Sequence, residues 1–457
     1  MVIKTFAKAK EYLESRIPVG VPDSNIYGLE RIRLLLEVMR NPQDAYPTVH
    51  VGGTAGKGST CTVLSHILNC AGYRVGLHVS PHIQDIRERE QVNGRLVSED
   101  KFVKLTNYVK QCSEEVANNS GYGMPTYFEM LVAMSFQHFK DEKVDIAVIE
   151  VGLGGRLDGT NVINPKVAII TNVGLDHMEI LGNTVESIAS EKTGIIKEGI
   201  DVVSGVSAPS VVRIVKNCAK TMHCRLDLLY KDISYTIREH STGRSVFDIN
   251  VRGINFEKLD TGLLGEHQMQ NIALAVDAAL MLGEHGFVIK EQDIRTAIRT
   301  SAVPGRFETL AYSPRIILDG AHNQMKAHAL VSTLKEYCKG MHIRVVFAAK
   351  KDKRAGEIIS ELSEITDKFY FTQFGVATDF GKRMAYSPQS LAAFATSDFE
   401  VFDKPGRALE RAIQESGKSD VICITGSLYL VGELRSYMLE KKRNFEVTFN
   451  RRIDSSK

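Results

Sequence analysis

The feature that most constrains this chain is a glycine-rich loop, residues 53–59, set between an apolar segment and an amphipathic one. The apolar segment, residues 46–51, predicts a buried strand, and the amphipathic segment predicts a helix that ends near Gly72. The apolar side chains of this helix fall on one face: Cys61, Leu64, Ile67 and Leu68. A strand, a glycine loop and a helix N-terminus in this order form a phosphate cradle, because backbone N–H groups and the helix dipole face the anion.

Two side chains of the loop suit a bound nucleotide. Lys57 offers a mobile positive charge, and Ser59 offers a hydroxyl to a magnesium ion that bridges phosphates. The loop departs from the common GxxxxGK[ST] pattern, because Gly58 separates the lysine from the serine. A glycine-rich turn without a ligand therefore stays open as the alternative.

Short apolar runs alternate with helical patterns along most of the chain. Further runs that predict buried strands are residues 74–79, 144–150, 166–172 and 201–206. Helical patterns fall between them, for example at residues 126–140 and 185–197. This alternation predicts an α/β fold in which a P-loop-containing, doubly wound and mostly parallel sheet carries helices on both faces.

The alternation also predicts two domains. Residues 1–300 form the first, with a small antiparallel β flap at about 225–260 and helices at 267–283 and 291–300. Residues 301–305 contain Pro304 and Gly305 and predict a linker. A smaller, Rossmann-like α/β domain is expected over residues 306–457. Its predicted strands are residues 315–318, 343–348, 368–372 and 420–425.

Composition excludes several classes of partner. The 57 basic and 55 acidic side chains of the 457 residues leave a net charge of +2, which gives no reason to expect nucleic acid or an acidic membrane. The seven cysteines are scattered without a CxxC pair and indicate reduced thiols. The first 16 residues contain Glu11 and Glu14 and no apolar core of signal-peptide length. We expect a cytoplasmic protein, with an organelle-targeting segment as the alternative.

Polar residues follow two of the predicted strands at the point where each strand ends. Glu150 ends one strand, and Asp176 and His177 follow the next. The carboxyl ends of parallel strands share one edge of the sheet, so we expect these side chains near Ser59. Glu150 is then a candidate metal ligand, the alternative being a solvated acid. His177 is a candidate metal or phosphate ligand, although magnesium prefers oxygen.

Further candidates have two interpretations each. Lys192 lies in a predicted amphipathic helix, where nothing local distinguishes it from a solvated lysine. Arg306, at the domain junction, either clamps a phosphate or forms an interdomain ion pair. Asn271 either contacts an adenine edge or caps a turn. Asp319 and His322 follow a strand of the second domain.

Between about Gly28 and Arg435, a set of short segments resembles the sequence motifs of a known enzyme family. The segments are GLERI (28–32), SPH (80–82), TYFE (126–129), EVGLGGRLD (150–158), LDH (175–177), EKTGIIK (191–197), PGRFE (304–308), DGAHN (319–323) and TGSL (425–428). In this order they resemble the motifs of the folylpolyglutamate synthase/dihydrofolate synthase family of the Mur ligase superfamily. The resemblance implies an ATP-dependent amide ligase that phosphorylates a folate-type carboxylate and joins the resulting acyl phosphate to L-glutamate.

The resemblance also implies roles for individual residues. The β- and γ-phosphates would be held by Gly56, Lys57, Gly58, Ser59 and Thr60. Magnesium would be bound by Ser59, Ser80, Glu150 and His177. Lys192 matches a position that is often carbamylated, which would create a second magnesium site. A potassium ion is a further candidate cofactor.

Other implied roles concern the rest of the nucleotide and the acceptor. Asn271, Arg306 and Asp319 would contact the nucleotide, and His322 would lie near the transferred phosphate. The catalytic set is therefore Lys57, His177, Lys192 and His322. The pterin and acceptor site would be lined by Thr126, Tyr127, Phe128, Glu129, Leu157 and Asp158.

The chain departs from the family pattern at several places. Ala55 stands where the family loop usually has asparagine. Residues 26–27 and 87–90 also differ, and both lie in the acceptor region. The alternatives are therefore a Mur-type ligase for a non-folate acceptor and a nucleotide-binding protein that has lost its activity. The expected partners are small molecules only, with no nucleic acid and no membrane, and we expect a monomer.

Overall fold

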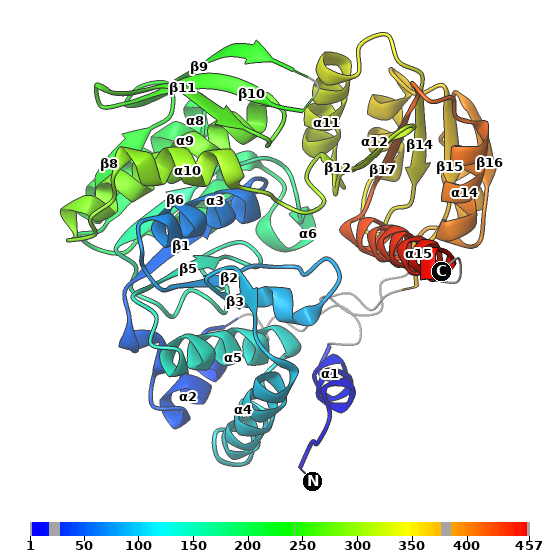
Figure 1. The fold of residues 1–457 in the computed structure, drawn as a ribbon. Helices are drawn as coiled ribbons and strands as arrows, with labels where there is room; N and C mark the ends of the chain where they lie inside the picture. The colour runs from blue at the N-terminus through cyan, green and yellow to red at the C-terminus, as the bar shows by residue number, and fades with distance from the viewer. Residues whose placement is uncertain (1, 18–27, 242, 376–384, 455–457) are drawn as a thin grey trace. The chain divides into compact units, whose positions relative to one another are not determined.

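A computed structural model of the chain describes residues 2–17, 28–241, 243–375 and 385–454. The chain divides into two compact units, the first ending at Ala302 and the second starting at Val303 (Figure 1). This division falls within residues 301–305, where the sequence predicts a linker.

The sheet of the first unit has eight strands among the described residues, in the order β4-β3-β2-β5-β1-β6-β7-β8. Neighbours from β2 to β8 pair in parallel, whereas β3 pairs antiparallel with β2 and β4. The strands are β1 (Thr48–Gly52), β2 (Val75–His78), β3 (Glu90–Val92), β4 (Arg95–Leu96), β5 (Ile146–Glu150), β6 (Val167–Ile170), β7 (Asp201–Ser204) and β8 (Arg225–Leu228). All residues of β1, β5 and β6 are buried, as a sheet covered on both faces requires.

Helices cover both faces of this sheet (Figure 1). On one face, α3 (Lys57–Cys70) contacts the central strands and packs against α9 (Glu266–Glu284) and α10 (Glu291–Thr300). On the other, α5 (Tyr127–Asp141) contacts β2 and β3. The remaining helical elements are α1 (Phe6–Glu14), α2 (Glu30–Val38), η2 (Pro42–Ala45), η3 (Ile86–Arg89), α4 (Glu99–Asn119), α6 (Met178–Leu181), α7 (Val185–Thr193) and α8 (Pro209–Thr221).

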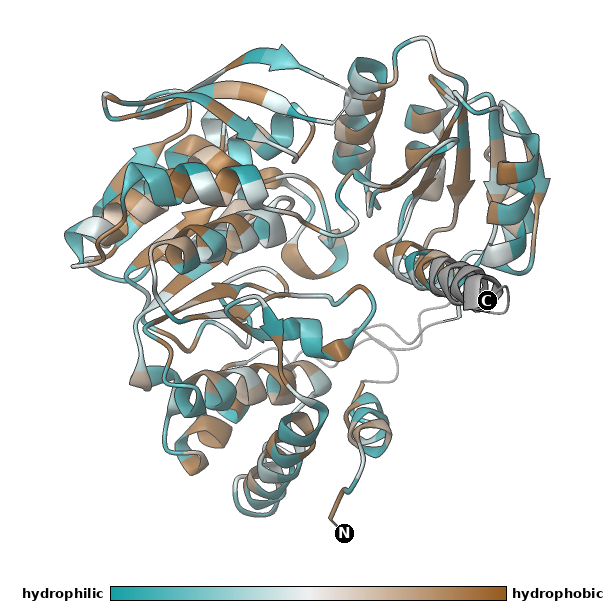
Figure 2. Ribbon diagram, viewed as in Figure 1, coloured by the Kyte–Doolittle hydropathy of each residue, from teal (hydrophilic) through white to brown (hydrophobic). Residues whose placement is uncertain are grey.

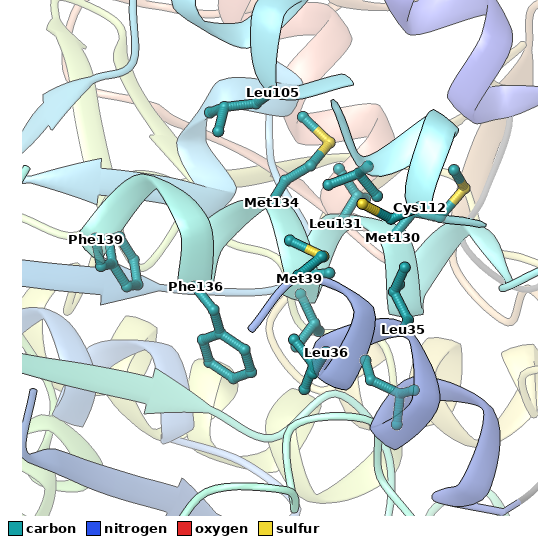
Figure 3. Close-up of a cluster of buried hydrophobic side chains, with 14 of the residues drawn as sticks. Leu35, Leu36, Met39, Leu105, Cys112, Met130, Leu131, Met134, Phe136 and Phe139 are labelled. Carbon is teal, nitrogen blue, oxygen red and sulfur yellow. The ribbon is translucent and has the colours of Figure 1, made fainter. Parts of the chain in front are cut away.

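A hydrophobic core lies among α2, α4 and α5 (Figure 3). Leu35 and Leu36 of α2, Leu105 of α4 and the methionines of α5 belong to one cluster, and all of these side chains are buried. Figure 2 shows the same segregation across the unit, with apolar residues on the strands and polar ones on the outer helix faces. Burial of these apolar faces is the main force that holds the helices on the sheet.

Two predicted elements have different limits in the structure. The antiparallel flap consists of β9 (Ile233–His240), β10 (Ser245–Val251) and β11 (Ile254–Thr261), so it begins later than residue 225. Residues 225–228 instead form β8, because this short run pairs in parallel with β7. The helix predicted over residues 185–197 ends at Thr193, and Gly194 is its C-cap residue. Gly194 lies against Arg156, with no room for a side chain.

The second unit is a smaller α/β sheet of six strands within the described residues, in the order β12-β13-β17-β14-β15-β16. Its pairs are parallel except for that of β12 with β13. The strands are β12 (Glu308–Tyr312), β13 (Arg315–Leu318), β14 (Ile343–Phe347), β15 (Lys368–Phe371), β16 (Asp398–Val401) and β17 (Val421–Thr425). The helices are α11 (Gln324–Tyr337), α12 (Ala355–Ser363), α13 (Pro388–Ala392), α14 (Pro405–Glu415) and α15 (Leu428–Asp454).

The expected α/β fold with two parallel sheets is thus confirmed. Within the part of the chain that the structure describes, no helix combines the length and the apolar character that crossing a bilayer requires.

Candidate active site

The glycine-rich loop joins the end of β1 to the first turn of α3. Gly56 occupies the helix N-cap position with φ +82°, a left-handed conformation that glycine adopts without strain. A side chain at Gly56 would also collide with Asn271, since its Cβ would lie 2.2 Å from Oδ1. Because Gly56 has no side chain to cap α3, the first N–H groups of the helix can serve an anion.

Two lysines meet at one carbonyl oxygen of this loop. Lys57 Nζ donates to Gly53 O at 3.2 Å, and Lys192 Nζ donates to the same oxygen at 2.9 Å. Lys192 is only 4% exposed, so the interpretation as a solvated lysine is wrong. Burial, reinforced by the neighbouring charge of Lys57, lowers the pKa of the Lys192 amine to about 7. A substantial fraction of this amine is therefore neutral and nucleophilic at physiological pH.

The carboxylate of Glu150 lies at the same edge, against the first turn of α3. A Cβ on Gly58 would be 3.4 Å from Glu150 Oε2, and the Ser80 N–H donates to that oxygen at 3.0 Å. Glu150 is 4% exposed, so it is not a solvated acid. The residue after Gly58 is Ser59, which is also buried.

These oxygen donors fit a magnesium ion. Among the described residues, no three His, Cys, Asp or Glu side chains converge as a metal centre. A magnesium ion here would therefore complete its shell with phosphate oxygens and water, which is its usual mode of binding beside a nucleotide.

The segment that carries His177 runs beside the loop. His177 has φ +51° and begins α6, with Nε2 3.8 Å from Asp176 Oδ1. Upstream on the same segment, Thr171 and Asn172 bond directly to loop residue Ala55. Sequence reasoning missed these two residues, although a polar pair directly after a strand next to β1 is a signal that could have found them.

Two other predicted nucleotide-binding residues of the first unit lie at the loop. Asn271, on α9, is 5% exposed and contacts the position of Gly56, while its Nδ2 donates to Gln268 Oε1 at 3.2 Å. Because the Asn271 side chain makes these contacts, it does not cap a turn. Thr60 is fully buried, and its N–H donates to Gly56 O at 2.9 Å.

Four of the six residues proposed to line the acceptor site lie at the N-terminus of α5. Thr126 caps the helix, and Glu129 accepts hydrogen bonds from the Thr126 N–H at 2.7 Å and from Arg31 Nε at 2.8 Å. Tyr127 is buried, whereas Phe128 lies so close to Gly152 that a Cβ there would be 2.4 Å from the ring. Thr126 and Glu129 thus fix the start of α5, and Phe128 presents its ring to the loop after β5.

Asp158 organises that loop. Its carboxylate accepts from the N–H groups of Leu153 at 2.7 Å and Thr160 at 3.0 Å, and burial raises its pKa. Leu157 is 36% exposed. The 152–160 loop is therefore built around a buried acid next to an accessible leucine.

The predicted residues of the second unit gather at the carboxyl end of β13. Asp319 accepts from the N–H groups of Phe307 and Ala321, both at 2.9 Å. Burial raises the pKa of the Asp319 carboxyl, and the charge of Arg306 opposes that shift. His322 Nδ1 bonds to Gly320 O at 2.8 Å and its Nε2 contacts Lys326 Nζ at 2.9 Å. Arg306, Asp319 and His322 thus share one end of this sheet.

The acceptor segments that depart from the family pattern are partly described. Residues 26–27 lie outside the described residues. In the 87–90 segment, Arg89 is fully buried and donates to His82 Nδ1 at 2.9 Å. Glu90 is also buried, and burial raises its pKa to about 8. Both residues are therefore part of the interior of the first unit, Arg89 at the end of η3 and Glu90 at the start of β3.

Two family models match the chain, the first within residues 1–302 and the second after residue 302. The Mur ligase middle domain matches residues 51–279, and the Mur ligase glutamate ligase domain matches residues 305–428. The dihydrofolate synthase/folylpolyglutamate synthase of Bacillus subtilis is 34% identical over 432 residues, which cover 94% of this chain and 98% of the relative. The chain belongs to the folylpolyglutamate synthase/dihydrofolate synthase family of Mur ligases.

Solved structures agree with this assignment. Folylpolyglutamate synthase from Thermotoga maritima is 33% identical, with a TM-score of 0.81, covering 94% of this chain and 96% of that one. E. coli FolC in complex with DHPP and ADP is 27% identical, with a TM-score of 0.84 over 96% of this chain and 99% of that chain. The expected family and the enzyme class, an ATP-dependent acid–amino-acid ligase, are confirmed.

Proposed function

We propose that this chain uses ATP to join L-glutamate to a folate-type carboxylate through an acyl phosphate. The observation that carries the proposal is the convergence of Lys57, Lys192 and Glu150 on the glycine loop of a folylpolyglutamate synthase family member. Relatives support the nucleotide, since E. coli FolC and the Mycobacterium tuberculosis enzyme have been solved with ADP.

In the first step, an oxygen of the acceptor carboxylate attacks the γ-phosphorus of ATP and ADP leaves. Lys57 would exchange the Gly53 carbonyl for the phosphates and neutralise their charge, while the N–H groups of the first turn of α3 orient them. In the second step, the neutral amine of glutamate attacks the acyl carbon and a C–N bond forms. The C–O bond to the phosphate breaks, phosphate leaves, and the nitrogen loses a proton to give the amide. The protein supplies positioning and charge, and these are the main contributions an enzyme makes to phosphoryl transfer.

Magnesium would be held by Ser59, Ser80, Glu150 and His177. When bound, it neutralises phosphate charge. A second ion requires an additional anion, which Lys192 can provide: its neutral amine attacks CO2, a C–N bond forms, and a proton leaves to give a carbamate. The buried position and the lowered pKa of Lys192 support this reaction. A potassium ion remains a further proposed cofactor.

The remaining roles are proposed on family grounds and on position. Asn271, Arg306 and Asp319 would contact the nucleotide, and His322 would lie near the transferred phosphate. Phe128, Leu157 and the loop around Asp158 would form the acceptor pocket, while Thr126, Tyr127 and Glu129 support it from α5. We further propose a cytoplasmic monomer that has small molecules as its only partners.

The acceptor is proposed to be a reduced folate, with dihydropteroate as a second acceptor. Relatives include proteins named for either activity: a folylpolyglutamate synthase from Lacticaseibacillus casei and a dihydrofolate synthetase from Saccharomyces cerevisiae, each 30% identical. An inactive nucleotide-binding protein is disfavoured, because Lys57 and Glu150 keep positions suited to chemistry.

Substitutions at the loop test this proposal. Lys57→Ala and Glu150→Ala should each abolish magnesium-dependent ADP formation, by at least about 100-fold. Lys57→Ala removes the cation that would neutralise the phosphates, and Glu150→Ala removes a carboxylate that would hold the magnesium ion. Lys216→Ala, at an exposed position on α8, is the matched control and should retain full activity. Circular dichroism should show that all variants are folded. Normal turnover by either loop variant would show that the phosphate or metal site lies elsewhere.

A further inference from the structure

Residues 171–174 continue from β6 past the edge of the sheet and hold the phosphate loop by one side. The Thr171 hydroxyl donates to Ala55 O at 2.6 Å, and Asn172 Oδ1 accepts from the Ala55 N–H at 2.8 Å. Both polar backbone groups of Ala55 are thus bonded by side chains from the segment that follows β6. Ala55 has no polar side chain with which to fix its own conformation.

The residue before Ala55 is held by the same segment. The Thr54 N–H donates to Asn172 O at 3.1 Å, and the Thr54 hydroxyl donates to Gly174 O at 3.1 Å and accepts from the Gly174 N–H at 3.0 Å. The packing is close as well, because a Cβ on Gly53 would lie 1.9 Å from Thr171 Oγ1. The loop is therefore tied to residues 171–174 at two consecutive residues.

The bond from Thr171 has a consequence for the next residue of the loop. Ala55 C=O and Gly56 N–H belong to one planar trans peptide, so they point in opposite directions. When Thr171 holds the carbonyl toward β6, the Gly56 N–H must point away from β6. Gly56 is the N-cap of α3, so the bond sets the orientation of an N–H group at the entrance to the anion site.

We propose that Thr171 and Asn172 are positioning residues that hold the loop ready to receive the phosphates of the nucleotide. They act through Ala55 and touch neither ATP nor the acceptor. This inference rests on the proposed function, in which the loop binds ATP. Such preorganisation lowers the ordering cost of binding, so it contributes directly to nucleotide affinity.

Two variants of Thr171 test the proposal, one that removes the hydroxyl and one that keeps it. Thr171→Val keeps the shape of the side chain and removes the hydroxyl, whereas Thr171→Ser keeps the hydroxyl. The matched control is Thr106→Val on α4, where a fully buried threonine hydroxyl likewise donates to a backbone carbonyl, Phe102 O at 2.9 Å. The Kd for the ATP analogue AMPPCP is measured by calorimetry, and KM for ATP and kcat by ADP release.

Thr171→Val should raise the Kd for AMPPCP and the KM for ATP by about 5- to 30-fold, the effect of one or two lost hydrogen bonds. Thr171→Ser should restore most of the affinity, and Thr106→Val should leave it unchanged. Asn172→Ala should raise the Kd for AMPPCP by a similar factor. The double variant should raise the Kd by less than the product of the two single-variant factors, because both bonds fix one residue, Ala55.

Other outcomes would overturn the inference. A merely structural role would lower the active fraction and hence kcat, with KM and Kd equal to those of the parent protein. If the parent binds AMPPCP and folded Thr171→Val binds it equally well, the positioning role is wrong while the proposed function stands. If the parent itself does not bind AMPPCP, the proposed function fails, and this inference fails with it.

Discussion

Gly53 combines three features that matter for the site. Its carbonyl accepts both lysines, its φ of +146° is one that side-chain-bearing residues rarely adopt, and its Cα faces Thr171 without room for a methyl group. The sequence shows only that a glycine stands here. The reason for it lies in Thr171, more than a hundred residues further along the chain.

We predict that Gly53→Ala raises the Kd for AMPPCP by more than about 10-fold, because the new methyl group must push the loop away from Thr171. Gly72→Ala is the matched control: it has a positive φ of +92° but no neighbouring atoms within 4 Å of the added Cβ. It should cost about 1 kcal/mol of stability from backbone strain and leave nucleotide binding intact. Equal nucleotide affinity in both variants, measured by calorimetry, would show that the contact with Thr171 does not matter.

Lys192 shows where sequence reasoning fails at this scale. The local pattern predicts an ordinary solvated lysine, and only the family resemblance suggests otherwise. Its amine bonds to Gly53 O, 139 residues away along the chain, and no local pattern can reveal such a partner. Lys57 and Glu150, in contrast, could be predicted because each lies where a strand or loop meets the same sheet edge.

For Lys192 we predict a carbamate in the native protein. Lys192→Ala should reduce ADP formation by at least about 10-fold, and a small carboxylic acid such as acetate should partly restore it by replacing the lost anion. Lys220→Ala, at an exposed position, should change nothing. An unmodified Lys192 in native mass spectrometry, together with normal turnover of Lys192→Ala, would contradict the carbamate.

At the scale of elements, a polar cluster of one arginine and two aspartates attaches the antiparallel flap to the body of the first unit. Arg252, in the turn between β10 and β11, has Nε 3.2 Å from Asp227 on β8 and Nη2 3.4 Å from Asp277 on α9. Burial, with the nearby charge of Asp227, raises the pKa of the Asp277 carboxyl to about 8. Asp277 is fully buried and is therefore largely protonated at neutral pH.

This raised pKa makes stability depend on pH. Unfolding releases the Asp277 proton above the ordinary pKa of 3.8, so the contribution of this residue to stability falls as pH rises from there to about 8. Asp277→Asn cannot ionise. Its unfolding free energy relative to the parent should therefore increase by about 3 to 4 kcal/mol between pH 5 and pH 8.

The measurement is urea denaturation at the two pH values. Asp44→Asn, which changes an exposed aspartate of the same unit, is the control and should show no such trend. A difference between Asp277→Asn and the parent that does not change with pH would mean that Asp277 is already ionised in the folded protein.

The elements themselves were predictable to differing degrees. The central strands β1, β5 and β6 could be predicted because fully buried strands read as continuous apolar runs. The edge strands β4 and β16 were missed, since both are short and mostly exposed and neither contains a continuous apolar run. Residues 225–228 were assigned to the flap because pairing with β7, rather than composition, makes them a strand of the main sheet.

At the scale of the whole molecule, the ordered set of motifs predicted more of the function than any single residue did. The glycine loop and the strand-end acids indicated a nucleotide site from physical reasoning alone, whereas glutamate and a folate acceptor came from the family resemblance. The residues at the end of β13, such as Asp319 and His322, form their own cluster in the second unit. Their roles could be predicted only from family motifs, because isolated polar residues after a strand fit many functions.

The measurement that tests the central claim most directly is ADP release from magnesium and ATP, with L-glutamate and either tetrahydrofolate or dihydropteroate. Each substrate is omitted in turn, and the product is identified by mass spectrometry. We predict ADP release that requires both glutamate and a folate-type acceptor, with one glutamate added to the acceptor for each ADP formed. No turnover with either acceptor, from protein that binds AMPPCP and turns over with a non-folate carboxylate, would contradict the proposed function.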